Sequence, residues 1–112
     1  MRFLGYTLGS EADMPTEPPP PDLYETMDKF VQEAVNAGVI VATGGIAPTS
    51  EGAKVSLQDG EFTVVDGPFT EAKELVGGWA LMECRDMDEA IEWTKRFLSV
   101  LGAGECRVRP VT

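Results

Sequence analysis

The chain has 112 residues, 43% of them hydrophobic, and its 9 basic and 19 acidic side chains give a formal net charge of −10. This length predicts a single domain spanning residues 1–112, with enough apolar side chains for a small core. The acidic charge argues against nucleic acid and anionic membrane surfaces as partners, because both attract basic side chains. No stretch approaches the roughly 20 apolar residues of a membrane span. Two cysteines without metal or redox spacing, in a chain without a signal peptide, indicate the cytoplasm.

A short apolar strand opens the chain and leads into a proline-rich loop. Residues 2–8 are predicted to form a central strand, since they are apolar on both alternating faces. The following loop, residues 9–21, ends in Pro18–Pro21, a run that favours polyproline II geometry and forbids helix. We interpret the run as a stiff surface connection that folding does not require. The alternative is a docking segment for a proline-reading partner.

Two amphipathic helices are predicted from matching start signals. The first is expected over residues 22–37, with Asp22 as its N-cap and Gly38 just past its end. The second starts after Asp86 and ends before Gly102. Each has a glutamate three positions after the capping aspartate, which is the capping-box pattern. The apolar stripe of the second helix comprises Met87, Ala90, Ile91, Thr94, Phe97, Leu98 and Leu101, flanked by Trp93.

The remaining regular segments are predicted to be strands. Residues 39–43 follow the first helix and are rich in β-branched side chains. Residues 54–57 and 61–65 are expected to form a hairpin, because the Asp59-Gly60 pair between them is a strong turn signal. Residues 106–111 close the chain as an edge strand.

The stretch from Asp66 to Cys84 combines a turn with the most apolar run of the chain. Asp66-Gly67-Pro68 is a turn sequence, and the proline prevents a central strand from running through it. Neither face of the strand expected over residues 75–84 is polar, which predicts burial on both sides. The chain's own helices can cover one side. We expect the same sheet of a second copy to cover the other. Gly77-Gly78 indicates a bulge or a close backbone approach in this strand.

The order strand–helix–strand, hairpin, strand–helix–strand predicts an α+β, ferredoxin-like fold with an antiparallel sheet and both helices on one face. The motif D-G-P-F-T-E-A-K-E-L-V-G-G, residues 66–78, resembles the DGPF subgroup of the YCII-related proteins. This resemblance implies a ferredoxin-like domain that dimerises through its sheet, as in dimeric α+β barrel proteins. It implies no settled activity. Better-understood YCII relatives pair a His with an Asp, and that pair cannot be transferred because this chain has no His.

The candidate site lies where the turn meets the apolar strand. Asp66 and Glu71 are the candidate catalytic residues, because a carboxylate at the mouth of an apolar pocket has a raised pKa and can act as a general base. Tyr6, Lys73 and Trp79 are the candidate substrate-binding residues. The alternatives are that Asp66 only caps its turn, and that the charges form a solvated strand start. No metal or cofactor is predicted, since the carboxylate spacing matches no known cation loop.

Two functions follow from these residues. The first is a cofactor-free enzyme that acts on a small organic molecule by carboxylate acid–base chemistry. The alternative is a non-catalytic, small-molecule-binding or regulatory homodimer. DGPF proteins are often encoded beside extracytoplasmic-function sigma factors, so the resemblance implies a signalling role for the alternative.

Overall fold

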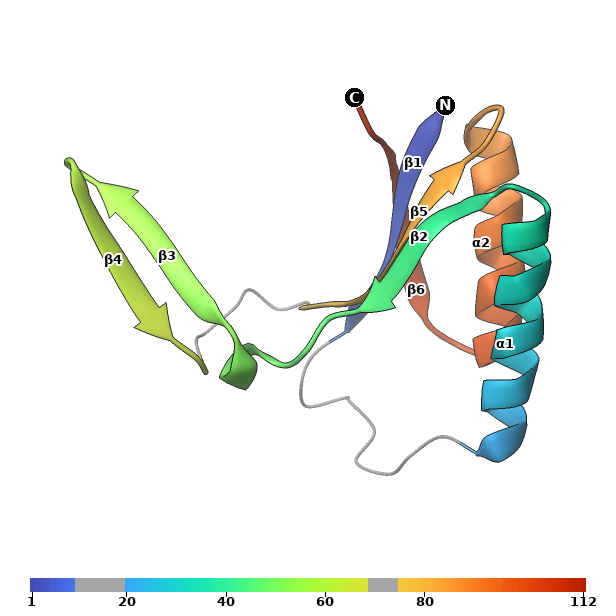
Figure 1. The fold of residues 1–112 in the computed structure, drawn as a ribbon, viewed down its shortest axis with the longest axis horizontal. Coiled ribbons are helices and arrows are strands. Elements are labelled where there is room, and N and C mark those ends of the chain that lie inside the picture. Colours follow the sequence, from blue (N-terminus) through green and yellow to red (C-terminus); the bar gives the residue numbers. More distant parts are fainter. Residues whose placement is uncertain (10–19, 69–74) are drawn as a thin grey trace.

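The computed structural model describes residues 1–9, 20–68 and 75–112 of the chain (Figure 1). Within these described ranges, six strands and two α-helices follow one another, with a 3-10 turn at Thr49–Glu51 between the second and third strands. Their bounds are β1 (Arg2–Gly9), α1 (Pro21–Asn36), β2 (Ile40–Gly45), β3 (Ala53–Gln58), β4 (Glu61–Asp66), β5 (Leu75–Glu83), α2 (Met87–Leu101) and β6 (Glu105–Pro110). None of the described helices is long and apolar enough to cross a membrane.

The fold is α+β and ferredoxin-like, as predicted. Four strands form an antiparallel sheet in the order β2-β5-β1-β6, so the two strands predicted to be central are central. Both helices lie side by side against one face of this sheet (Figure 1). Each βαβ half crosses over through its helix, which is why α1 and α2 cover the same face.

The predicted N-cap of the first helix was wrong, and that of the second is confirmed. Helix α1 begins at Pro21 with Pro20 in the N-cap position, and no side chain bonds to the cap. Proline suits the first helical position because its φ angle is already helical and its missing N–H would be unpaired there. In α2, the Glu89 backbone N–H donates to Asp86 Oδ1 at 2.9 Å. Gly102 ends this helix at φ +88°.

The bulge expected at Gly77-Gly78 is present. The β1–β5 register shifts between Tyr6 and Leu8, opposite the two glycines. The backbone N–H of Gly78 donates to Thr7 Oγ1 at 2.7 Å, so a side chain satisfies a donor that the ladder leaves unpaired.

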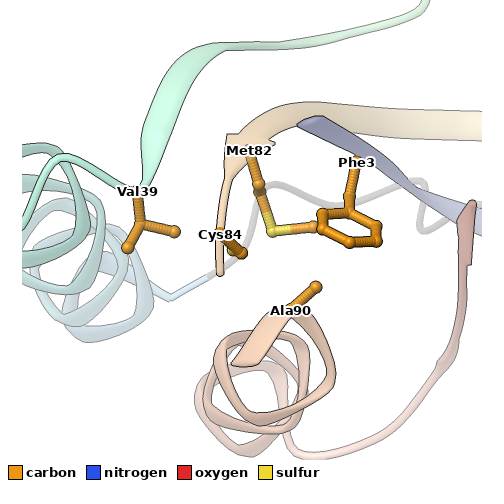
Figure 2. Packing of buried hydrophobic residues seen from close by; sticks show 5 residues of the cluster. All are labelled: Phe3, Val39, Met82, Cys84 and Ala90. Atoms are coloured by element: carbon orange, nitrogen blue, oxygen red, sulfur yellow. The ribbon is translucent and has the colours of Figure 1, made fainter. Parts of the chain in front are cut away.

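A cluster of buried hydrophobic residues lies where β1 begins and β5 ends. Phe3 and Met82 are directly opposed across these two strands and point toward Ala90 of α2 (Figure 2). Val39 and Cys84 complete the buried cluster. Phe3 is only 1% exposed. This end of the sheet is therefore filled, and any internal space must lie toward the other end.

Strand alternation assigns the other side chains to the two faces of the sheet. Because Phe3 and Met82 face the helices, Tyr6 and Trp79 point to the opposite face. We call this helix-free side the open face. Its apolar side chains are half-buried: Leu4, Tyr6, Leu8, Trp79 and Leu81. Strand β6 adds Arg107 and Arg109 to it by the same alternation.

Strands β3 and β4 form a separate two-stranded sheet that projects on the side away from the helices (Figure 1). Asp59 and Gly60 have φ angles of +52° and +80°, which confirms the predicted hairpin turn. The hairpin extends the molecule: the radius of gyration is 16.2 Å, against about 13 Å for a compact domain of this length.

Candidate binding site

A cavity of about 150 Å³ lies between the helices and the sheet. It adjoins the buried cluster around Phe3 through Val39 and Met82, and extends from there toward the other end of the sheet. Its roof is aromatic: Phe30 comes from α1, and Trp93 and Phe97 come from α2. The Phe30 ring is centred 6.1 Å from the Trp93 ring and 6.3 Å from the Phe97 ring. These tilted contacts hold the two helices together above the cavity.

Small residues on the sheet explain why the space is not filled. Gly5 of β1 and Gly78 and Ala80 of β5 are lining residues on the helix-facing side. They offer almost no side-chain volume beneath the aromatic roof. A Cβ at Gly5 would lie 3.1 Å from Met82 Cε, so the packed core begins immediately beyond this position.

The Arg96 side chain stacks on the aromatic rings of the roof. The Arg96 guanidinium carbon lies 4.5 Å from the centre of the Trp93 ring and 5.6 Å from that of Phe30. Its Nη2 is 2.7 Å from Glu33 Oε1, which joins α2 to α1. The Arg96 and Glu33 side chains are 45% and 59% exposed, so this bridge orients the ring stack more than it stabilises the fold.

Two hydroxyls that line the cavity have spare acceptor capacity. The Thr43 hydroxyl donates to the Trp79 carbonyl and the Thr94 hydroxyl donates to the Ala90 carbonyl, each at 2.8 Å. A hydroxyl whose hydrogen is engaged still has lone pairs. None of the described lining residues is Asp, Glu, Lys or Arg. The cavity therefore suits a neutral ligand that donates a hydrogen bond.

Cys106 of β6 also lines the cavity and is half-buried. Burial raises the pKa of its thiol above the ordinary value, and the adjacent Glu105 carboxylate adds to the shift. The thiol is accordingly neutral at physiological pH and is a poor nucleophile.

Alkylation of Cys106 by iodoacetamide should be slower than that of an exposed cysteine peptide at every pH between about 7 and 9. The thiolate is the reactive form, and a raised pKa lowers the thiolate fraction. The rate should keep rising with pH after the peptide's rate has levelled off. Mass spectrometry of Cys84→Ser protein isolates this site. A rate equal to that of the peptide would contradict the assignment.

The structure brings together two of the five predicted site residues. Tyr6 and Trp79 are directly opposed on β1 and β5, and both contribute to the cavity lining. Strand alternation directs their side chains to the open face of the sheet. Asp66 ends β4 opposite Ala53, on the projecting hairpin, and does not line the cavity. Glu71 and Lys73 lie outside the described residues.

Sequence reasoning missed the aromatic roof and the threonines. Phe30, Trp93 and Phe97 have helical core spacing, and nothing in that spacing distinguishes a packed interface from a cavity wall. The sequence did contain one signal of a cavity. The residues opposite the large rings, Gly5 and Ala80, have side chains too small to fill the space beneath them.

Within the described ranges, no group of three or more His, Cys, Asp or Glu could hold a metal ion.

Comparison with known proteins gives a family. The model of the YCII-related domain matches residues 1–112. An uncharacterised protein of Rhizobium meliloti (strain 1021) is 32% identical over 91 residues, covering 80% of this chain and 70% of that protein. A solved structure is described as 5-chloro-2-hydroxyhydroquinone dehydrochlorinase (TftG) from Burkholderia phenoliruptrix AC1100 in complex with 2,5-dihydroxybenzoquinone. It matches with a TM-score of 0.44 at 18% identity, covering 100% of this chain and 94% of that one.

Proposed function

We propose that this chain, which belongs to the YCII-related domain family, binds a small neutral aromatic molecule that carries a hydroxyl group. The observation that carries this proposal is the apolar cavity of about 150 Å³ under three aromatic rings. An apolar cavity of that size holds one benzene-sized molecule, whereas drug-sized ligands occupy about 300 Å³ or more. The ligand is therefore a single ring.

The charge and hydrogen-bonding groups of the cavity limit the class of possible ligands further. An anion would lose its hydration without gaining a cationic partner among the described lining residues. The net charge of −10 also repels anions at a distance. A ligand hydroxyl, in contrast, can donate to Thr43 Oγ1 or Thr94 Oγ1. Phenol is the simplest molecule that meets both requirements.

The proposed working form is a homodimer of single-domain subunits that pack their open faces together. The apolar side chains there are half-buried in one copy, although no described helix covers them, and a second sheet completes their burial. Static light scattering at micromolar concentration should give twice the 12.1 kDa mass of one chain.

We place the protein in the cytoplasm, where its two free thiols stay reduced.

Carboxylate catalysis is a separate prediction, and it requires a carboxylate close to the bound molecule. A carboxylate must reach the bound molecule, and Asp66 lies on the hairpin instead of in the cavity lining. Binding is therefore the function that the geometry supports best. The Asp66→Asn variant tests catalysis, because Asn preserves the shape of the side chain and cannot act as a base. If the variant binds the ligand with unchanged affinity and no longer converts it, Asp66 is the base.

Isothermal titration with phenol, benzene and benzoate tests the binding proposal. Phenol should bind most tightly, because it fills the cavity and donates one hydrogen bond. Benzene should bind more weakly, by about a factor of ten, for want of that bond. Benzoate should show no binding. Benzoate affinity equal to or above that of phenol would contradict a neutral, acceptor-lined site.

A further inference from the structure

We propose that the β3–β4 hairpin is an arm that packs its apolar face on a second copy of this chain. Directly opposed residues share a face, so the ladder register separates the two faces. One face carries Val55, Leu57, Phe62 and Val64 beyond the Ala53–Asp66 pair at its base. The other face carries Lys54, Ser56, Gln58, Glu61, Thr63 and Val65. This alternation is typical of a strand pair with one face covered.

In a single copy the apolar face is uncovered. Val55 is 65% exposed, Leu57 61%, Phe62 74% and Val64 63%. These side chains form a continuous strip, because Val55 opposes Val64 and Leu57 opposes Phe62. An isolated two-stranded hairpin is only marginally stable in water. The arm therefore needs a surface that supplies the missing layer.

A second copy fits this requirement by position. The arm projects on the same side of the sheet as the open face, away from both helices (Figure 1). A copy that docks on the open face consequently meets the arm of the first. Twofold symmetry makes the arrangement reciprocal, since each copy provides one arm and one receiving surface.

The charges favour the same partner. The tip of the arm carries Asp59 and Glu61, and the chain as a whole has a net charge of −10. An acidic tip approaching a second acidic chain needs a local cationic surface. Strand β6 is an edge of the sheet and carries Arg107, Arg109 and Glu105 on the open face, so the charge of this strand is net positive there. We assign this strand of the partner as the landing site of the tip.

Two neighbouring substitutions on opposite faces of the arm provide the test. Phe62→Asn removes the largest apolar side chain of the covered face, and Thr63→Asn places the same residue on the polar face as a matched control. The dimer dissociation constant is measured by sedimentation equilibrium. Phe62→Asn should raise it about ten- to hundredfold, because burial of one aromatic side chain per subunit is lost. Thr63→Asn should leave it unchanged.

A second variant shortens the arm. Ala53 and Asp66 are directly opposed, so an Asn-Gly turn can replace residues 54–65 while circular dichroism checks that the main sheet and helices remain folded. The dimer of this variant should dissociate at least as readily as that of Phe62→Asn.

The inference about the arm rests on the proposed dimer, and the possible outcomes distinguish a failure of the dimer from a failure of the arm. A monomeric wild-type protein contradicts the dimer and the arm together. A stable dimer that neither arm variant weakens, or that both single substitutions weaken equally, contradicts the arm alone.

Discussion

Phe3→Ala should lower the free energy of unfolding by about 3–5 kcal/mol. Among the described residues, Phe3 is the largest fully buried side chain, and it packs against Met82 of β5 and Ala90 of α2 (Figure 2). Its removal leaves a cavity that the strand backbone cannot close. Small domains have only about 5–15 kcal/mol of total stability, so this loss should be plain in urea denaturation at fixed protein concentration.

The matched control is Ile91→Ala, one residue after Ala90 on the same helix. Ile91 is 39% exposed, so its truncation should cost less than about 1.5 kcal/mol. If Phe3→Ala and Ile91→Ala lower the free energy of unfolding equally, the buried cluster is not centred on Phe3. The arrangement of α2 over β1 and β5 would then be incorrect.

Ala80→Leu should reduce phenol affinity by about a hundredfold or more, a loss of roughly 2.7 kcal/mol. Ala80 lies on the cavity floor, directly opposed to Gly5, where the neighbouring strand offers no side chain. The three added carbon atoms occupy space that the ligand needs. Since they enter an existing void, the thermal midpoint should change little. Calorimetric titration and thermal denaturation together measure both effects.

Ala42→Leu is the control for this experiment. Ala42 is opposed to Leu81, so alternation places it on the open face of the sheet, and it is exposed. The same enlargement there should leave phenol affinity unchanged. If Ala42→Leu abolishes binding and Ala80→Leu does not, the ligand binds on the open face and the cavity assignment is wrong.

Most of the fold was predictable from local patterns. The β1 and β5 strands, the Asp59-Gly60 turn and the Asp86 cap each follow from a few neighbouring residues, and each is confirmed. The start of α1 was mispredicted because Asp22 and Pro21 are both good starting residues, and the backbone favours proline at the first helical position. Ile91 and Leu101 carry helical core spacing, yet both are 39% exposed, because spacing alone does not fix the width of the buried stripe.

The site was less predictable because it depends on distances between elements. Asp66 and Trp79 are 13 residues apart, and the stretch from Asp66 to Cys84, which contains them both, suggested one pocket. The structure places Asp66 at the base of the hairpin and the indole of Trp79 over Gly44, where a Cβ would lie 3.3 Å from the ring. The cavity instead lies under Phe30, Trp93 and Phe97, which the sequence assigns to the core. Whether aromatic side chains fill a space or surround it depends on the residues opposite them, and those become neighbours only in the folded chain.

The most direct test of the binding proposal is a phenol titration followed through the indole N–H signals of the two tryptophans. Trp93 lies in the cavity roof, whereas the ring of Trp79 lies on the open face over Gly44. Saturable binding should shift the Trp93 signal and leave the Trp79 signal in place, and Ala80→Leu should suppress the shift. A shift of Trp79 alone would place the ligand on the open face and contradict the proposed site.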